Sequence, residues 1–435
     1  MNLVDFTNLY DAFSAGSVAT FAPKFRAKCI DMFKEHGLPS RKQEAWRYAS
    51  ISSWGLPQDV VMPAVGTSMP QEVMANLSSE LIKDADIINY NGEIIILNHV
   101  PGVSIVSMQD LLKDDESALD TLITTKIVDL CPQNPFIAYA LACLSGGICI
   151  KVDENMADII SLKVLNYKDK NIFANEFNWV EVGANSKLDL CVRNLGSESG
   201  HYWLNSLNYF ALAENSELRS EVLQNESDLA ISHNVNIVMQ AKASSYIQKE
   251  FACGAKVSRS ESIVFLNAEG ASADLSGVNH VKSGSWHNTN LTLKHLASNC
   301  ISRQNFRSIL HVNSACVFLG HIYVPCGVKA SEAYQDSKNM LLGSGARAIA
   351  KPYLEIYTDD VVCTHSATVG QIDKNMLFFL LSRGFSKDKA KLLLLKSFIC
   401  EIFSEDSDVH FAKIVIDLIS KYNVLSQAKT KEELC

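Results

Sequence analysis

Four similar turn sequences recur in the middle of the chain: Asn185-Ser186-Lys187-Leu188, Asn215-Ser216-Glu217-Leu218, Ala243-Ser244-Ser245-Tyr246 and Ser272-Ala273-Asp274-Leu275. When their final residues are aligned, the spacings are 30, 28 and 29 residues. A fixed period of roughly 20–50 residues is typical of solenoids and other repeat proteins. The turns therefore predict a repeat architecture, and the content of each period decides its type.

Each period contains two strand-like runs, such as residues 203–211 and 217–223, with no long helix between them. β-Branched and aromatic residues bounded by turn sequences are typical of strands. Two strands per repeat fit a parallel β-helix, which would have roughly seven coils between residues 156 and 370. A β-sandwich with similar turns is the alternative. We therefore predict a mainly β fold with a parallel β-helix core.

The first region, residues 1–155, has a mixed helical and strand pattern. Pro23 suits the first turn of a helix, because its missing N–H would be unpaired there, and Gly37 is a typical stop. Apolar residues recur at helical spacing between them: Phe25, Cys29, Ile30 and Phe33. The basic and aromatic stretch 38–48 contains Trp46, either a packed anchor or part of a binding surface. Residues 93–106 alternate as strands do.

The third region, residues 371–435, returns to helical periodicity. Asp373 is a candidate N-cap, Gly384 a stop and Ser386 the cap of a second helix. That second helix is apolar over more than one stripe, from Leu392 through Phe403. A helix of this kind must be covered on two sides, so a partner protein could cover one of them. The third helix has a single apolar face.

Composition excludes several classes of protein. The 435 residues carry a net charge of −9 with a pI of about 5.7, so nucleic acid is not expected as a partner. The uncharged stretch 130–150 contains two prolines and two glycines together with polar amides, which argues against a membrane span. Residues 1–16 do not resemble a secretory signal. Twelve cysteines without a Cys-x-x-Cys pair indicate reduced thiols in the cytoplasm.

Few residues offer chemistry. The Gly-rich stretch 343–348 lacks the Lys-Ser/Thr pair of a phosphate-binding loop, so we expect no ATP site. Five of the eleven histidines lie within 42 residues: His280, His287, His295, His311 and His321. These histidines could be metal ligands on successive coils, or buried core residues. His295 shares its parity with Leu291 and Leu293, which favours a core histidine hydrogen-bonded to a backbone group.

Cys363 and His365 form the sharpest local feature. On an extended strand, residues two apart project to the same face, so a thiol and an imidazole would lie side by side. These groups suit iron or copper, but two ligands do not complete a site, and the remainder would come from elsewhere or from another chain. The alternative is two half-buried strand residues. Asp359 and Asp360 are interpreted as a solvated edge or turn.

Several motifs, taken together, resemble the SufB/SufD family of iron–sulfur cluster assembly proteins, and SufD within it. The motifs are Pro39-x-Arg41-Lys42-x-Glu44-x-Trp46-Arg47-Tyr48, Asn134-Pro135-Phe136, Gly146-Gly147-Ile148, Ala333-Tyr334-Gln335, Lys338-Asn339-Met340-Leu341-Leu342, Pro352-x-Leu354-Glu355-Ile356, Asp359-Asp360-Val361-x-Cys363-x-His365-x-Ala367-Thr368-Val369-Gly370 and Ser382-Arg383-Gly384. They run in family order from residue 38 to about 403. Two positions depart from the family pattern, Ser366 after the histidine and Gln335-Asp336-Ser337-Lys338 before Asn339.

The resemblance implies a right-handed parallel β-helix between an N-terminal α/β region and a C-terminal helical domain. It implies a non-catalytic scaffold that pairs with a SufB-like subunit through its last coils and with a SufC-like ABC ATPase through its C-terminal helices. His365, and less directly Cys363, would hold transient iron or a nascent Fe–S cluster at the SufB interface, with no cofactor bound stably. The candidate ATPase-docking residues are Leu380, Arg383, Gly384, Leu393 and Phe398.

Other interpretations remain open at this point. The chain could be a SufB-like paralogue, although Ser366 and the Arg41-Lys42 pair favour SufD. It could be a purely structural adaptor in which His365 is inert. A β-helix enzyme acting on carbohydrate is the least favoured class, because such enzymes are usually secreted. The isolated chain could form a homodimer, and neither nucleic acid nor a membrane is expected as a partner.

Overall fold

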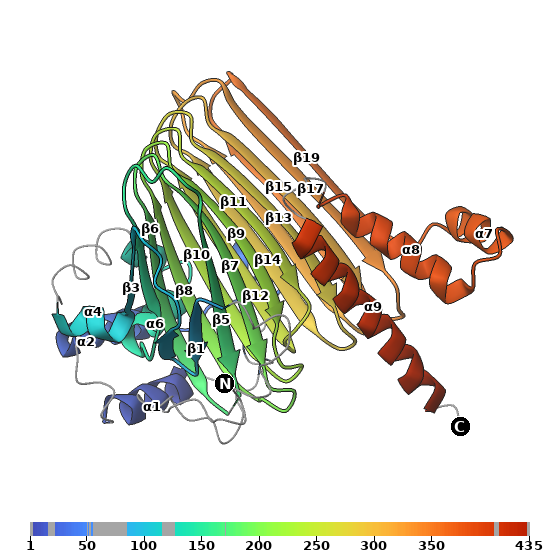
Figure 1. Cartoon of the computed structure of the whole chain (residues 1–435), viewed down its shortest axis with the longest axis horizontal. Helices are drawn as coiled ribbons and strands as arrows, with labels where there is room; N and C mark the ends of the chain where they lie inside the picture. The colour runs from blue at the N-terminus through green and yellow to red at the C-terminus, as the bar shows by residue number, and fades with distance from the viewer. Residues whose placement is uncertain are drawn as a thin grey trace.

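Parallel strands wind through most of the chain as a two-sheet solenoid (Figure 1). The computed structural model describes residues 3–15, 22–49, 51, 54, 85–114, 127–169, 171–403 and 409–432. Within this part of the chain, one sheet has ten strands and the other has nine. From Ile148 onward, successive strands alternate between the two sheets and pair in parallel with the strand one coil earlier, whereas the strands before Ile148 add two antiparallel pairings. This is the two-strand coil that the repeat predicted.

The strands of the two sheets follow one another along the chain. The first sheet contains β1 (Ile87–Tyr90), β2 (Glu93–Ile96), β5 (Ile160–Lys168), β7 (Lys187–Gly196), β9 (Glu217–Asn225), β11 (Ser245–Ala252), β13 (Ser272–Val281), β15 (Ile301–Leu310), β17 (Ser331–Leu341) and β19 (Val361–Gly370). The second contains β3 (Val103–Ser107), β4 (Ile148–Val152), β6 (Phe173–Val182), β8 (Trp203–Leu212), β10 (Ile231–Gln240), β12 (Val257–Leu266), β14 (Trp286–His295), β16 (Ala315–Val324) and β18 (Arg347–Ile356).

The described coils number about eight, from β4 to β19, rather than seven. The difference arises because the first coil already begins at Ile148, before the boundary at residue 156. The pairing of the first three turns is as predicted, since Leu188, Leu218 and Tyr246 lie in register. The fourth alignment is wrong: Tyr246 pairs with Ala273, and Leu275 pairs with Gln248. A shift of two residues keeps the same face inward, so alternation alone does not reveal it.

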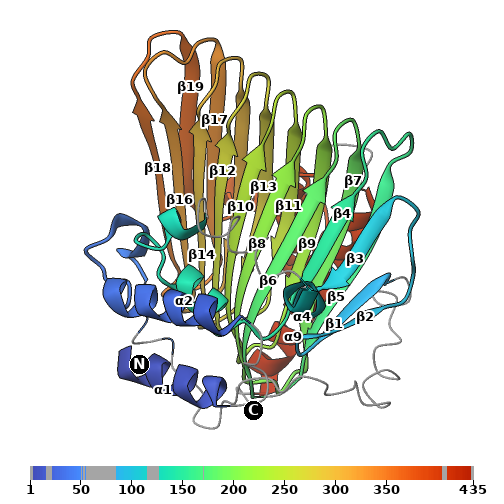
Figure 2. The same cartoon turned by 90° about the vertical axis from the view of Figure 1, so that its left-hand side faces the viewer.

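Helices of the N-terminal region cover the outer face of the second sheet (Figure 2). They are α1 (Leu3–Ser14), α2 (Pro23–His36), the 3-10 turn η2 (Glu44–Trp46), α4 (Met108–Asp114), the 3-10 turn η5 (Val128–Leu130) and α6 (Phe136–Ala142). Phe6 and Phe33 pack with Trp203 and Ile231 in one apolar cluster. As predicted, α2 starts at Pro23 and ends before Gly37, and strands occupy much of residues 93–106.

Trp46 is the anchor of this region, which confirms the packing interpretation. It is 1% exposed, and its indole N–H donates to the carbonyl oxygen of Gln133 at 3.0 Å. The guanidinium carbon of Arg259, on β12, lies 3.8 Å from the ring centre. Asn134 donates to the Glu261 carboxylate at 3.2 Å, so the Asn134-Pro135-Phe136 motif also fastens this region to the sheet.

Three helices follow the last coil: α7 (Lys374–Ser382), α8 (Lys387–Cys400) and α9 (Val409–Glu432). Asp373 caps α7 as predicted, because its Oδ1 accepts from the backbone N–H groups of Asn375 and Met376 at 2.7 and 3.2 Å. Ser386 caps α8. The α8–α9 pair lies on the outer face of the first sheet and buries one outward column of that sheet. The column includes Leu223, Phe251 and Val278.

Candidate functional site

The solenoid ends without a covering element at its last coil, within the described residues. β18 pairs with β16 and β19 pairs with β17, and no further described strand continues either sheet. Their outer backbone N–H and C=O groups therefore form a parallel edge of the kind that pairs with another chain. This open end is the first candidate site.

Cys363 and His365 both lie on the inward face of β19, at the open end. Cys363 is in register with Ala333, which continues a buried column through Leu188 and Leu218. His365 is in register with Gln335, one column further along the strand. The prediction that both side chains share a face is therefore confirmed. Because no described coil follows, the His365 side chain is exposed although it points along the solenoid interior.

Cys363 has a more packed setting than His365. It is half-buried and joins an apolar cluster that includes Ile322, Val324 and Leu354. Burial raises the pKa of its thiol. Within the described residues, no group of three or more His, Cys, Asp or Glu side chains could hold a metal ion. Cys363 and His365 are thus two donors that need further ligands to form a metal site.

The clustered histidines occupy separate environments. His295 is a buried core histidine, as predicted, but its Nε2 lies 2.8 Å from the Ser302 hydroxyl rather than beside a backbone group. The Nε2 atoms of His280 and His311 lie 2.8 Å apart beneath α9. His321 pairs with Glu355 at 3.3 Å on the outer face of the second sheet. His287 is buried, with its pKa lowered by burial to about 4. In the described part of the chain, these residues do not form one ligand set.

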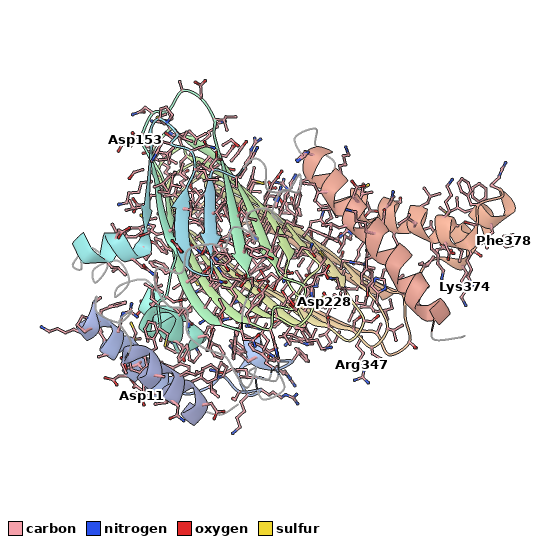
Figure 3. The ribbon with its side chains drawn as sticks, turned by 60° about the horizontal axis from the view of Figure 1, so that its bottom comes forward. Asp11, Asp153, Asp228, Arg347, Lys374 and Phe378 are labelled. Atoms are coloured by element: carbon pink, nitrogen blue, oxygen red, sulfur yellow. The ribbon has the colours of Figure 1, made fainter. Side chains whose placement is uncertain are left out.

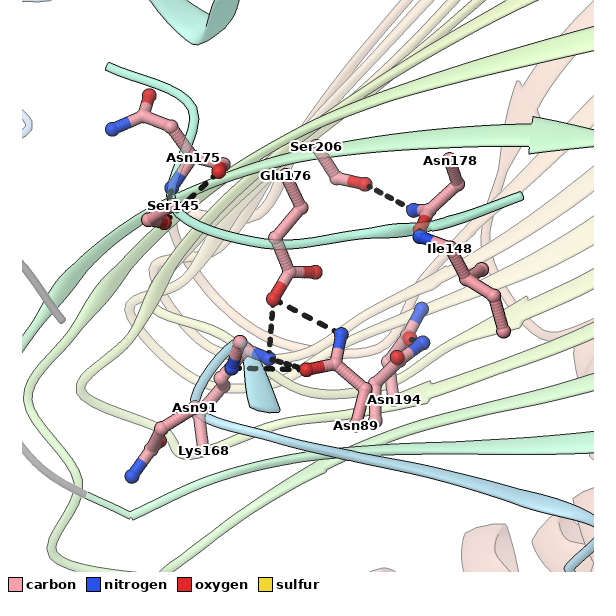
Figure 4. Close-up of polar contacts among 12 residues, drawn as sticks. Asn89, Asn91, Ser145, Ile148, Lys168, Asn175, Glu176, Asn178, Asn194 and Ser206 are labelled. Carbon is pink, nitrogen blue, oxygen red and sulfur yellow. Dashed lines mark hydrogen bonds and ion pairs between the residues drawn. The ribbon is translucent and has the colours of Figure 1, made fainter. Parts of the chain in front are cut away.

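Polar side chains inside the solenoid were missed by sequence reasoning. At the end opposite His365, a buried ion pair joins Lys168 Nζ to Glu176 Oε1 at 2.6 Å, and Asn89 donates to the same carboxylate at 3.1 Å (Figure 4). Further along, an amide ladder runs from Asn178 to Asn208, Asn236 and Ser262. The ladder could have been found, since asparagine recurs at the coil spacing. The ion pair could not, because neither partner stands in a recognisable pattern.

The helical arm formed by α7 and the start of α8 is the second candidate site. It extends away from the coils, with Lys374 and Phe378 at its outer part (Figure 3). Phe378 is 71% exposed, and Phe379 and Met376 are each 51% exposed. Such a group of large exposed apolar side chains marks an interaction surface.

The five docking candidates divide between this arm and the solenoid side of α8. Leu380 is half-buried on α7, and the Arg383 guanidinium carbon lies 5.2 Å from the centre of the Phe379 ring. Leu393 is 38% exposed, and Gly384 turns the chain between the helices with φ of 86°. Phe398 is different: it packs against the cluster beneath α8, 6.0 Å from the Arg307 guanidinium carbon. Within the described residues, each helix is too short or too polar to cross a bilayer.

The fold and these two surfaces define a class of protein: a parallel β-solenoid with an open end and a helical arm. The family model described as "SUF system FeS cluster assembly, SufBD core domain" matches residues 165–398. The chain therefore belongs to the SufBD family of the SUF iron–sulfur cluster assembly system, and it is SufD-like.

Curated relatives agree with this assignment. The chain is 25% identical over 381 residues to the iron–sulfur cluster assembly protein SufD of Escherichia coli, covering 84% of this chain and 85% of that protein. It is 27% identical over 206 residues to a SufBD family protein of Synechocystis, covering 47% of this chain and 45% of the relative. It is also 27% identical over 212 residues to the chloroplastic protein ABCI7 of Arabidopsis thaliana, covering 48% and 44%.

Proposed function

We propose that this chain is a non-catalytic scaffold subunit of a cytoplasmic SUF complex, in which clusters are assembled at its open solenoid end. The observation that carries the proposal is the geometry of β19: Cys363 and His365 face the same way on an uncovered coil. The coil can pair through its backbone edge with a homologous SufB-like chain, which would supply the missing ligands. Imidazole replaces thiolate at iron in some Fe–S sites, so a mixed set is chemically sound.

The helical arm would bind the SufC-like ATPase, which supplies the hydrolysis of ATP. The apolar side chains of Met376, Phe378 and Phe379 are uncovered in this chain and would be buried by a partner. Leu380, Arg383, Gly384 and Leu393 lie on or beside the same surface. Phe398 would act indirectly, by fixing α8 to the solenoid. Iron or a nascent cluster is cargo at the open end rather than a resident cofactor.

Affinity capture tests the arm. The chain would be co-expressed with SufB-like and SufC-like subunits and captured through a tag on itself. Phe378→Glu combined with Phe379→Glu should lose the ATPase and keep the SufB-like subunit, because these side chains are exposed and contribute little to folding. Leu229→Glu is the matched control, since Leu229 is 49% exposed on a distant turn. These variants are sharper than truncation after Gly370, which would also uncover Leu223 and Phe251.

His365→Ala tests the role of the open end in the same system. We expect both partners to be captured normally while Fe–S enzyme activity in cells falls at least about 10-fold, the scale typical of a lost metal-site group. His99→Ala is the control, because His99 is also exposed but lies far away in the N-terminal region. Unchanged Fe–S enzyme activity in His365→Ala would reject the cluster role. Capture of neither partner by the unmodified chain would reject the scaffold role.

A further inference from the structure

Gln335 lies directly beneath His365 in the solenoid interior. The two residues are register partners on β17 and β19, and Gln304 on β15 is the partner of Gln335 one coil further in. Side chains in register on neighbouring strands of a parallel sheet stand about 4.8 Å apart on the same face. Gln335 is 3% exposed and Gln304 is 1% exposed. The interior column therefore ends in two buried amides and one exposed imidazole.

Only the nitrogen of the Gln335 side-chain amide has a hydrogen-bond partner among the described residues. Its Nε2 donates to Gln304 Oε1 at 3.1 Å. Its Oε1 is buried and has no hydrogen-bond partner among the described residues. A buried carbonyl oxygen without a donor is costly, and native structures rarely leave one unpaired. The imidazole of His365, the register partner of Gln335 on the next strand, has an N–H group that can donate a hydrogen bond.

The opposite sheet is shaped to accept this amide pair. Gly320 on β16 faces it, and a Cβ atom added at Gly320 would lie 2.8 Å from Gln304 Oε1 and 3.0 Å from Gln335 Nε2. Both distances are shorter than ordinary van der Waals contacts with carbon. The glycine therefore leaves the space in which the two amides meet, which indicates a built arrangement rather than two polar residues at loose positions.

We propose that Gln335 is a positioning residue for His365: its Oε1 accepts the imidazole N–H and leaves the other ring nitrogen unprotonated toward the open end. A neutral imidazole has one N–H and one lone pair, and the hydrogen bond made by the first decides which nitrogen can bind a metal. Metal-binding histidines are commonly oriented in this way by a carbonyl or carboxylate oxygen. The inference rests on the proposed role of His365 and adds the group that orients it.

The tautomer of His365 is the readout that separates positioning from mere packing. Nitrogen-15 NMR of the full chain with labelled histidine, at pH 8, would report which ring nitrogen carries the proton, and His365→Ala assigns the signal. One tautomer should dominate in the unmodified chain. Gln335→Met should shift the signal to the mixture of free histidine, because it removes the acceptor. Gln335→Glu should retain the single tautomer, because it keeps an oxygen there.

Asn339→Leu is the matched control. Asn339 is also an inward amide of β17, is 4% exposed and also has an unpaired oxygen. Its register partner on β19, however, is Val369 rather than His365. It should leave the His365 signal unchanged. A free-histidine mixture in the unmodified chain would overturn the proposal. So would an Asn339→Leu shift as large as that of Gln335→Met.

Cluster formation in cells separates this inference from the function on which it rests. Gln335→Met should reduce Fe–S enzyme activity about 10-fold or more, as expected for loss of a group that orients a ligand, and Gln335→Glu should largely restore it. If His365→Ala lowers activity but Gln335→Met changes neither activity nor tautomer, the positioning role is wrong and the proposed function stands. If the tautomer responds as expected but His365→Ala has no effect, the proposed function is wrong and the hydrogen bond stands.

Discussion

Glu250 places a carboxyl group inside the solenoid, in a cavity of about 80 Å³. Its Oε2 accepts hydrogen bonds from Gln248 Nε2 and Ser260 Oγ, both at 3.2 Å. Burial raises the pKa of this carboxyl from 4.5 to about 7, and the two hydrogen bonds only partly oppose the increase. The folded chain thus holds this proton more tightly than the unfolded chain does.

The sign of the effect on stability follows from that difference. Well below pH 4.5 the carboxyl group is protonated in both the folded and the unfolded state, so it does not change the free energy of unfolding with pH. As the pH rises toward 7, the unfolded state ionises first, so the free energy of unfolding falls. Glu250→Gln should remove this fall and be more stable than the unmodified chain at pH 8 by about 2 kcal/mol, allowing for partial exposure. Urea unfolding at pH 5 and pH 8 measures the free energy of unfolding of both proteins. The same change between the two pH values in the variant and in the unmodified chain would contradict the role of Glu250.

Alternation along a strand was sufficient to place Cys363 and His365 together, since the face of a residue depends only on its parity. It could not show that this face is the solenoid interior, because the inward face of the preceding strand, β17, carries the polar residues Gln335, Ser337 and Asn339. Gln335 belongs to a recognised motif, yet its unpaired oxygen depends on where Gln304 lies, and that depends on the pairing of separate coils. Trp46 was predictable as an anchor, but its partner Arg259 was not.

Helices and strands were predicted best where a local sequence signal, such as a capping residue, marks the end of the element. Pro23, Asp373 and Ser386 each start a helix as expected, because caps and N-terminal prolines act locally. The strand turns were less secure, because a coil can gain or lose two residues without changing which side chains face inward. That tolerance explains why the fourth turn was aligned at Leu275 instead of Ala273.

The docking of α9 should depend on pH through two histidines. His280 and His311 lie in contact beneath α9, and the ring of Tyr422 on α9 packs edge-on against both, with centroids 4.8 and 4.7 Å away. Burial lowers the pKa of His311 to about 4 and that of His280 well below its usual value, helped by neighbouring Lys282 and His287. Two touching imidazoles cannot both be charged without repulsion.

Acid should therefore loosen α9. Because both pKa values are lower in the folded chain, the stabilisation is present above the usual histidine value of 6.5 and is lost as the pH falls toward 4. The protection factors of the α9 backbone amides, which compare the observed exchange rate with the intrinsic rate at the same pH, should fall over this range. The double variant His280→Gln, His311→Gln should show a weaker pH dependence of α9 docking. His410 on α9 is present in both proteins, so it cannot account for a difference between them. An equal loss of protection in the double variant would contradict the role of the pair.

At the scale of the whole molecule, the open end should make the isolated chain self-associate. Val369 is 49% exposed on the inward face of β19, with no described coil above it. Val369→Asp should shift a dimer toward monomer in sedimentation experiments, because a charge would be buried between stacked coils. Leu229→Asp, on an equally exposed turn residue, should not. A chain that is monomeric at all concentrations, or one that both variants affect equally, would contradict end-to-end stacking.

The architecture as a whole was predictable because a solenoid repeats the same local signal many times, so errors in one coil do not destroy the pattern. The number of coils was underestimated because the first coil does not carry this repeated signal clearly. The first coil, with β4 and β5, has Asn155 at the turn position of Asn185, but the residues after Asn155 do not repeat the Ser-x-Leu sequence of the later turns. The helical arm was anticipated as a doubly apolar helix, but its exposed surface lies mainly on α7 rather than on α8.

The α8–α9 pair also has a consequence for how the protein comes apart. A stack of coils held only by neighbours would fray one coil at a time, like a row of weakly linked units. These helices cross the row instead, touching Arg193 on β7 through Phe411 and Arg307 on β15 through Phe398 and Glu401. Lys338 on β17 also pairs with Glu401, at 3.0 Å. The strands from β7 to β17 are thereby tied into one cooperative unit, whereas β18 and β19 remain outside the tie. Under mechanical load, the terminal coil should peel first and the strapped coils should rupture together in a single event.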